Sequence, residues 1–200
     1  MDIEALFLQR QAGEGGANHM DIVEHMGTLR ALADQVATVV EFGVRTGNST
    51  VAFLASNCRH VISYDIADPQ FAPAADVAHK WAFRRADTAG LDFIPACGLL
   101  FIDTLHTYAQ VKAELEHAGK VARYLVFHDT VNYGGRDEGN ANGYGIMSAI
   151  LEFLATNPEW RVDAHFKNCN GLTVLRRVRA EGGLNNSAQT AGPNSNENSK

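Results

Sequence analysis

The chain alternates between short, continuous apolar runs and longer stretches in which apolar residues recur three or four positions apart. The first pattern is typical of strands that are buried on both faces of a sheet, and the second of amphipathic helices. The apolar runs predict strands over residues 39–42, 61–64, 99–102 and 124–127, and a further short strand is expected over residues 82–85, before Asp87. The helical spacing predicts helices over residues 22–36, 49–55, 74–80, 108–118 and 146–154.

The C-terminal part of the chain departs from this alternation. Two strands are predicted over residues 160–166 and 172–178, and the Asn170-Gly171 dipeptide between them is typical of a hairpin turn. Strands that alternate with helices form an α/β sheet covered by helices on both faces. The C-terminal hairpin is expected to add an antiparallel element at one edge of that sheet. We expect one domain over residues 21–180, a flexible segment over 1–20 and a disordered polar tail over 181–200.

Small or acidic residues follow the apolar strands. Gly43, Asp65, Asp103 and Asp129 each stand where a predicted strand ends. Carboxylates are poor core material, and ligands of open α/β sheets bind beyond the carboxyl ends of the strands. The sequence therefore predicts a ligand site at this edge of the sheet.

The turn after the first strand narrows the class of ligand. It reads Glu41, Gly43 and Gly47 in the pattern acid-x-Gly-x-x-x-Gly, and the next helix would be capped by Asn48 or Ser49. A dinucleotide site needs a glycine where Arg45 stands, and the phosphate-binding P-loop pattern is absent. Asp65 lies 22 residues beyond Gly43, close to the ~20-residue offset of an acid that binds a ribose.

These features resemble the class I S-adenosylmethionine-dependent methyltransferases over roughly residues 21–178. Tyr64-Asp65, Ala86-Asp87-Thr88 and the segment ending at Asp103 are similar to the later motifs of that family. The resemblance implies a Rossmann-like three-layer α/β/α sandwich with a mostly parallel seven-stranded sheet, and S-adenosyl-L-methionine as cofactor. The cofactor-binding residues that it implies are Glu41, Gly43, Gly47, Ser49, Asp65, Asp87, Thr88 and Asp103.

Two further segments, residues 101–108 and 126–130, resemble the small-molecule O-methyltransferases and the cephalosporin-hydroxylase-like group. The resemblance implies a divalent metal on Asp103, His128 and Asp129, with His128 in the place of a third acid. Magnesium prefers oxygen ligands, whereas imidazole suits other metals, so the presence and identity of a metal stay open. His106, His128 and Asp129 are the candidate catalytic residues, and a histidine that titrates near neutrality is a suitable general base. Without a metal, His106 is the first choice.

Composition and charge narrow the function classes further. Lys and Arg number 17 against 23 Asp and Glu, which gives a net charge of −6 and does not favour a nucleic-acid partner. No apolar run reaches the ~18 residues of a membrane helix, and the first thirty residues show no signal-peptide pattern. Three widely spaced cysteines favour a reducing compartment. We expect a cytoplasmic enzyme with a small-molecule acceptor and no membrane partner, either monomeric or a homo-oligomer.

The glycine-rich stretch over residues 131–145 is long for a loop between a strand and a helix. It is either a lid or a disordered loop, and its side chains that could contact the acceptor are Tyr133, Arg136, Asp137, Glu138 and Tyr144. His19, His25 and His117 are interpreted as surface residues. Three other functions remain open: a methyltransferase acting on RNA or protein, another reaction on the same fold, and a non-catalytic module that binds the cofactor.

Overall fold

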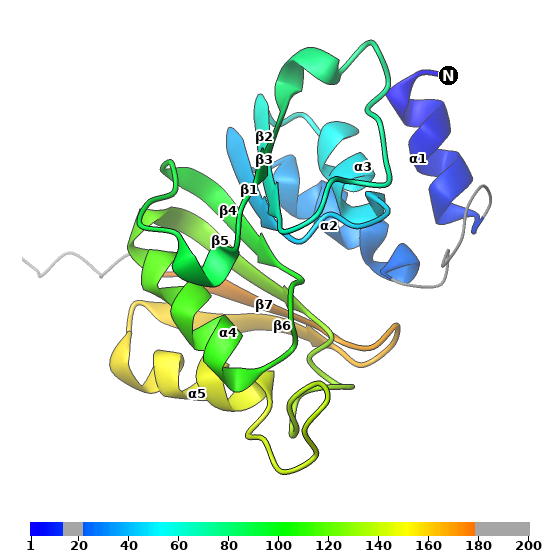
Figure 1. The fold of residues 1–200 in the computed structure, drawn as a ribbon. Helices are drawn as coiled ribbons and strands as arrows, with labels where there is room; N and C mark the ends of the chain where they lie inside the picture. The colour runs from blue at the N-terminus through cyan, green and yellow to red at the C-terminus, as the bar shows by residue number, and fades with distance from the viewer. Residues whose placement is uncertain (14–21, 179–200) are drawn as a thin grey trace, which may run out of the picture.

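The computed structural model describes residues 1–13 and 22–178 (Figure 1). Its strands are β1 Thr38–Phe42, β2 His60–Asp65, β3 Trp81–Arg85, β4 Cys97–Ile102, β5 Val121–His128, β6 Trp160–Phe166 and β7 Leu172–Arg177. Its helices are α1 Ile3–Gln11, α2 Met26–Ala33, α3 Asn48–Leu54, α4 Tyr108–Glu114 and α5 Ile146–Thr156. Short 3-10 helices are η1 Val23–His25, η2 Ala78–Lys80, η3 Thr88–Gly90 and η4 Leu115–Lys120.

The strands form one seven-stranded sheet in the order β3-β2-β1-β4-β5-β7-β6. The first five strands in this order run parallel, and β7 is antiparallel to both β5 and β6. The predicted α/β/α sandwich with an antiparallel C-terminal hairpin is therefore confirmed.

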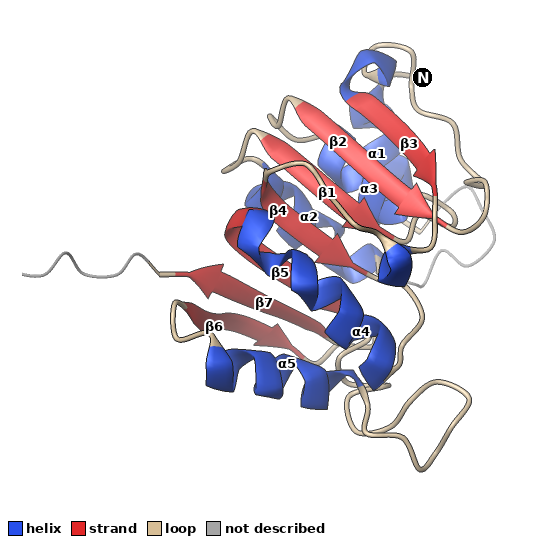
Figure 2. Ribbon diagram, turned by 60° about the vertical axis from the view of Figure 1, so that its left-hand side comes forward, coloured by secondary structure: helices blue, strands red, loops and turns tan. Residues whose placement is uncertain are grey.

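The helices cover the two faces of the sheet (Figure 2). Neighbouring residues of a strand point to opposite faces, so Val39 packs with α2 and α3 whereas Val40 packs with α4 and α5. Both side chains are fully buried, which explains the continuous apolar runs of the sequence. No helix among the residues that the structure describes is long and apolar enough to cross a membrane.

The register brings the strand ends together. Phe42 pairs with Tyr64 on one side and with Ile102 on the other, and Ile102 pairs with Phe127. Gly43, Asp65, Asp103 and His128 follow or close these strands, and they therefore share one edge of the sheet.

The N-terminal segment corrects one expectation. Residues 3–11 of the predicted flexible segment form α1, which packs on α3. Ile3 and Phe7 are buried in the core, and their spacing of four residues places both on one face of this helix. Residues 14–20 of the predicted flexible segment and the tail predicted over residues 181–200 lie outside the described residues.

Tertiary contacts shorten several predicted helices. The helix expected over residues 22–36 is η1 followed by α2, and the helix expected over 108–118 is α4 followed by η4. Of the helix expected over 74–80 only η2 forms, while Asp76 in the same stretch accepts a hydrogen bond from the backbone of Ile3. Helix α3 has Gly47 at its N-cap, because Asn48 accepts a bond from Arg10 and Ser49 donates one to Glu41.

Candidate functional site

The turn after β1 is tight, and an acidic side chain from β2 holds it. Gly43 has a φ of +89°, and a Cβ on it would lie 1.9 Å from the carbonyl oxygen of Asp103. The Asp65 carboxylate accepts hydrogen bonds from the backbone N–H groups of Val44 and Arg45, at 2.8 and 3.2 Å. The pairing of a glycine with an acid one strand away, which the sequence predicted, is therefore present in the structure.

Glu41 lies beneath this turn and has no exposed surface. Its carboxyl accepts hydrogen bonds from the hydroxyls of Ser49 (2.6 Å), Thr50 (2.8 Å) and Ser63 (2.5 Å). Burial raises the pKa of Glu41 to about 7, although these hydroxyls act to lower it. Glu41 therefore supports the turn from inside the protein.

Gly47, at the end of the same turn, faces a side chain of the protein. A Cβ on Gly47 would lie 2.5 Å from the ring of Phe71, which belongs to the connection between β2 and β3. Position 47 requires glycine for two reasons: the Phe71 ring lies too close for a Cβ, and the backbone of Gly47 has a φ of +79°. The sequence could not assign this role, because nothing in its local pattern marks Phe71 as the neighbour.

A cavity of about 440 Å³ opens beyond the carboxyl ends of β1, β2 and β4. We call it the β2-side cavity; its wall includes Gly43–Arg45, Asp65, Ile66, Asp87, Thr88, Thr104 and Gln110. Ile66 and Leu105 both line it and are 69% and 54% exposed, unusually open for large apolar side chains. An acid and an open apolar side chain together suit a ligand with a hydroxylated sugar and a flat ring.

A second cavity of about 320 Å³, the β5-side cavity, adjoins the first. The two share Gly43–Arg45, Ile66 and residues 103–105 as common walls. The walls of the second cavity alone include Asn48, Ser49, His106, Asp129 and Glu138. Ser49 therefore lines the β5-side cavity, away from Asp65 and Asp87.

His106 stands among three carboxylates in the β5-side cavity. Its Nε2 lies 3.2 Å from Asp103 Oδ1 and 3.0 Å from Asp129 Oδ2, and its Nδ1 lies 2.8 Å from Glu138 Oε2. Burial lowers the pKa of His106, but Asp103 and Asp129 outweigh it and raise the pKa to about 10. In this state the ring is an imidazolium, which has no lone pair to accept a proton.

His128 lies deeper than His106 and uses both ring nitrogens within the protein. Its Nδ1 is 3.4 Å from Asp103 Oδ1 and 3.2 Å from Asp129 Oδ2, and its Nε2 is 3.0 Å from the carbonyl oxygen of Cys169. Burial acts to lower the pKa of His128, but the carboxylates hold it far above its usual range. The same two histidines outweigh burial and keep the pKa values of Asp103 and Asp129 below normal.

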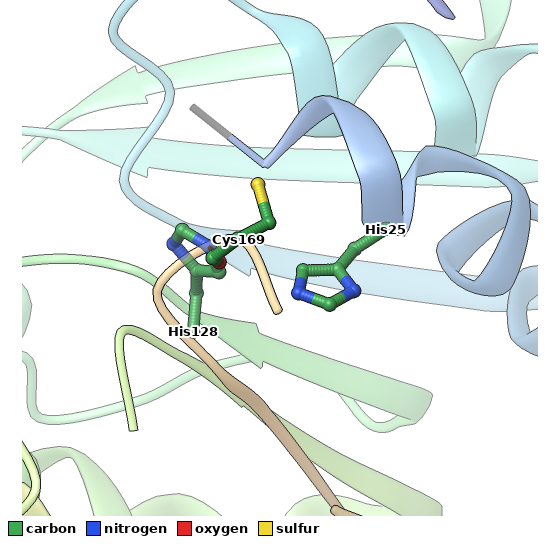
Figure 3. A group of neighbouring side chains, drawn as sticks. All are labelled: His25, His128 and Cys169. Atoms are coloured by element: carbon green, nitrogen blue, oxygen red, sulfur yellow. Dashed lines mark hydrogen bonds between the residues drawn. The ribbon is translucent and has the colours of Figure 1, made fainter. Parts of the chain in front are cut away.

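His25 and His128 together anchor the tip of the β6–β7 hairpin (Figure 3). The His25 Nε2 lies 3.0 Å from the carbonyl oxygen of Asn168, and the two rings meet edge to face with centroids 5.9 Å apart. Both Nε2 atoms face carbonyl oxygens, which can only accept, so both carry hydrogen. The group of His25, His128 and Cys169 is thus explained by hydrogen bonding, without a metal.

Two histidines interpreted as surface residues are buried. His25 is 1% exposed for the reason just given, and His117 is 8% exposed and meets the ring of Phe42 edge to face. Each follows a glutamate in the chain, so the local sequence does not mark either histidine as buried. His19 lies outside the described residues.

The glycine-rich stretch over residues 131–145 is fixed to the rest of the site. Asp137 Oδ1 accepts bonds from the backbone N–H groups of Tyr108 (2.8 Å) and Gly145 (3.0 Å). The Tyr133 ring stacks on His106 with centroids 4.8 Å apart, and Glu138 accepts from the same histidine. The loop therefore covers the carboxylate cluster and contributes one of its acids.

The donor set can be compared with what a metal requires. Asp103, His106 and Asp129 each offer a ligand atom close to the other two, which gives two carboxylate oxygens and one imidazole nitrogen. This set suits divalent transition metals better than it suits magnesium. His106 is thus a second candidate for the third ligand beside His128, whose Nδ1 lies 3.4 Å from Asp103 Oδ1 and 3.2 Å from Asp129 Oδ2.

Comparison with known proteins gives one family match over part of the chain and several matches to its fold. A sequence model described as a methyltransferase domain matches residues 40–130, which run from β1 to the end of the cluster. No curated protein matches the chain.

Several solved structures share the fold at low sequence identity. An O-methyltransferase from Bacillus cereus in complex with SAH has a TM-score of 0.56 and 17% identity, covering 88% of this chain and 90% of that one. The N-methyltransferase NodS from Bradyrhizobium japonicum WM9, bound to S-adenosyl-l-homocysteine, has a TM-score of 0.58 and 14% identity, with coverages of 88% and 99%. A ribosomal protein L11 methylase from Lactobacillus delbrueckii subsp. bulgaricus has a TM-score of 0.55 and 16% identity, with coverages of 82% and 81%.

These neighbours differ in the atom and the molecule that they methylate, so the fold alone does not select an acceptor. Residues 40–130 thus match a methyltransferase domain, and the chain shares the fold of these solved methyltransferases.

Proposed function

We propose that this enzyme transfers a methyl group from S-adenosylmethionine to a hydroxyl oxygen of a small molecule. The observation that carries the proposal is the pair of adjoining cavities, one beside Asp65 and the other ending at the carboxylate cluster. A cofactor in the first and an acceptor in the second would meet at the shared wall, next to Gly43 and Asp103. The acceptor cavity of about 320 Å³ favours a small molecule.

The β2-side cavity fits the nucleoside part of the cofactor. Asp65 would accept hydrogen bonds from the ribose hydroxyls, and Asp87 would approach the adenine. Ile66 and Leu105 offer their open apolar side chains to the faces of the base. The cofactor would supply a methyl group bonded to a sulfonium sulfur. The acceptor oxygen, on the side opposite the sulfur, would bond to the methyl carbon while the carbon–sulfur bond breaks and S-adenosylhomocysteine leaves.

The β5-side cavity fits an acceptor held by oxygen. Asp103, His106 and Asp129 would hold a divalent cation there, and such a cation lowers the pKa of a hydroxyl that it binds. Glu138 accepts the hydrogen of His106 Nδ1, so the proton that would have to leave when a cation binds is the one on Nε2, between the two aspartates. Tyr133 stacks on the same ring and reduces the access of water. His128 orients Asp103 and Asp129 from below, as a positioning residue.

The experiment that tests this function combines binding with product analysis. Calorimetry with S-adenosylhomocysteine should show binding to the wild type, and a panel of catechols, phenols and vicinal diols should include an acceptor that gains one methyl on oxygen. Removal of divalent metal with a chelator should abolish turnover while leaving S-adenosylhomocysteine bound. Methylation confined to nitrogen, to RNA or to protein would overturn the proposed acceptor, and no binding of S-adenosylhomocysteine would overturn the proposed cofactor site.

A further inference from the structure

Glu114 is a buried carboxyl on α4 that the assignments above leave without a role. It has no exposed surface. Its Oε1 accepts three hydrogen bonds, from Thr88 Oγ1 (2.5 Å), Thr104 Oγ1 (2.8 Å) and Gln110 Nε2 (2.9 Å). Its Oε2 has no hydrogen-bond partner among the described residues. All three hydrogen bonds that Glu114 accepts therefore end on the same oxygen atom, Oε1.

The three donors belong to separate segments of the cavity wall. Thr88 lies on η3, Thr104 follows β4, and Gln110 lies in the first turns of α4. All three line the β2-side cavity, whereas Glu114 stands behind them. Thr88 directly follows Asp87, so this part of the wall is the end of the cavity where the adenine would lie.

Proton counting fixes the orientation of the Gln110 carboxamide. The hydroxyl hydrogen of Thr88 is given to Glu114, so the Thr88 oxygen can only accept from Gln110. Gln110 Nε2 lies 3.1 Å from that oxygen and 2.9 Å from Glu114 Oε1, and because these two acceptors are themselves 2.5 Å apart, one amide hydrogen is shared between them. A flipped amide would put its carbonyl oxygen against two acceptors. The Gln110 carbonyl oxygen, an acceptor, therefore lies on the side of the carboxamide away from Glu114 Oε1 and is not used by these bonds.

We propose that Glu114 is a positioning residue that holds the Gln110 carboxamide so that its carbonyl oxygen accepts from the exocyclic amino group of the adenine. This inference rests on the proposed cofactor site and adds a determinant of base specificity to it. The amino group of adenine carries two hydrogens, and Asp87 and Gln110 together offer an acceptor for each. A purine with oxygen at the same carbon has no hydrogen there to donate, and its oxygen would face the Gln110 oxygen.

The test is calorimetry on the full chain with two ligands that differ only at this position of the purine, S-adenosylhomocysteine and S-inosylhomocysteine. The wild type should bind the inosyl analogue about tenfold more weakly or worse, because an acceptor is left opposite an acceptor. In Glu114→Gln the new amide can donate to Gln110, which frees that carboxamide to turn its N–H₂ outward. The ratio of the two dissociation constants should then fall below about threefold, a change of roughly threefold or more.

Two further variants separate this role from a general loss of structure. Gln110→Ala removes the acceptor at a partly buried position of α4, and it should lower the ratio in the same way. Glu116→Gln, on the exposed side of η4, is the matched control and should leave the ratio at its wild-type value. A variant that merely loosens the cavity would weaken both ligands equally, with no change in the ratio.

The results distinguish the two levels of the proposal. If the wild type binds S-adenosylhomocysteine and both Glu114→Gln and Gln110→Ala keep the wild-type ratio, the role of Glu114 is overturned while the cofactor site stands. If Glu114→Gln does not fold, an unchanged ratio in Gln110→Ala alone overturns it. If the wild type does not bind S-adenosylhomocysteine, the proposed cofactor site is wrong and this inference with it.

Discussion

The buried carboxyl of Glu41 should make the stability of the protein depend on pH, and Glu41→Gln should remove that dependence. Burial raises the pKa of Glu41 from an ordinary 4.5 to about 7 in the folded protein. Between these two values the folded state keeps a proton that the unfolded state has already released. The unfolded state therefore binds fewer protons in this window, and the free energy of unfolding falls as pH rises.

The size of the effect follows from the two pKa values. Their difference, from 4.5 to about 7, corresponds to roughly 3 kcal/mol between the two ends of the window. This contribution is fully present below about pH 4.5 and is lost as pH rises through about 7. Because Glu41 is wholly buried, solvent does not screen it. Glutamine has nearly the same shape and stays neutral at every pH, so the variant lacks this contribution to the pH dependence.

The prediction is tested by urea unfolding monitored by circular dichroism. The free energy of unfolding is extrapolated to water at several pH values from about 4.5 to 8. The difference between wild type and Glu41→Gln should change by roughly 3 kcal/mol across the window, with the variant relatively more stable at high pH. Glu116→Gln, which removes an exposed carboxylate, should run parallel to the wild type. Parallel curves for Glu41→Gln and the wild type would show that the Glu41 carboxyl titrates alike in both states, and would refute the reasoning.

Three further substitutions test the site. Asp65→Ala should weaken S-adenosylhomocysteine binding by about 1–3 kcal/mol in calorimetry, because a charge-assisted acceptor is lost; an unchanged dissociation constant would contradict the ribose assignment. Asp129→Asn should lower turnover much more than it lowers cofactor affinity, and an equal loss of both would mean that the two cavities do not divide the work. Gly43→Ala should lower the melting temperature by several degrees, since a Cβ would lie 1.9 Å from a backbone oxygen at a φ of +89°; a melting temperature equal to wild type would refute the close approach.

The order of elements could be predicted from the sequence largely because the central strands β1 and β4 are buried on both faces. A run such as Val39–Phe42 cannot be solvated, so its place in a sheet follows from composition alone. The edge that carries the site followed as well, because acids end several of these strands. These inferences need only the local pattern and the known behaviour of parallel sheets.

The partners within the site could not be predicted, because they depend on contacts between distant segments. The sequence placed Glu41 on the cofactor, but three hydroxyls from α3 and β2 hold it inside the protein. It also assigned the third metal-ligand position to His128. The hairpin tip, some forty residues further along the chain, occupies that ring's second nitrogen and leaves His106 facing the cavity. Helix α1 was missed for a related reason, since Ile3 and Phe7 are its only fully buried side chains.

Glu41 and Glu114 are both buried carboxyl groups that orient surrounding side chains through hydrogen bonds. Each is fully buried and accepts hydrogen bonds from three side chains, which for Glu41 belong to α3 and β2 and for Glu114 to the wall of the β2-side cavity. A buried carboxyl lowers stability unless such bonds compensate, so neither is explained by packing alone. A carboxyl group can accept several hydrogen bonds on one atom, which lets it orient several hydroxyl and amide groups from one side. The cavity wall thereby presents backbone N–H groups and carbonyl oxygens in fixed directions before any ligand arrives, which lowers the entropy that binding must overcome.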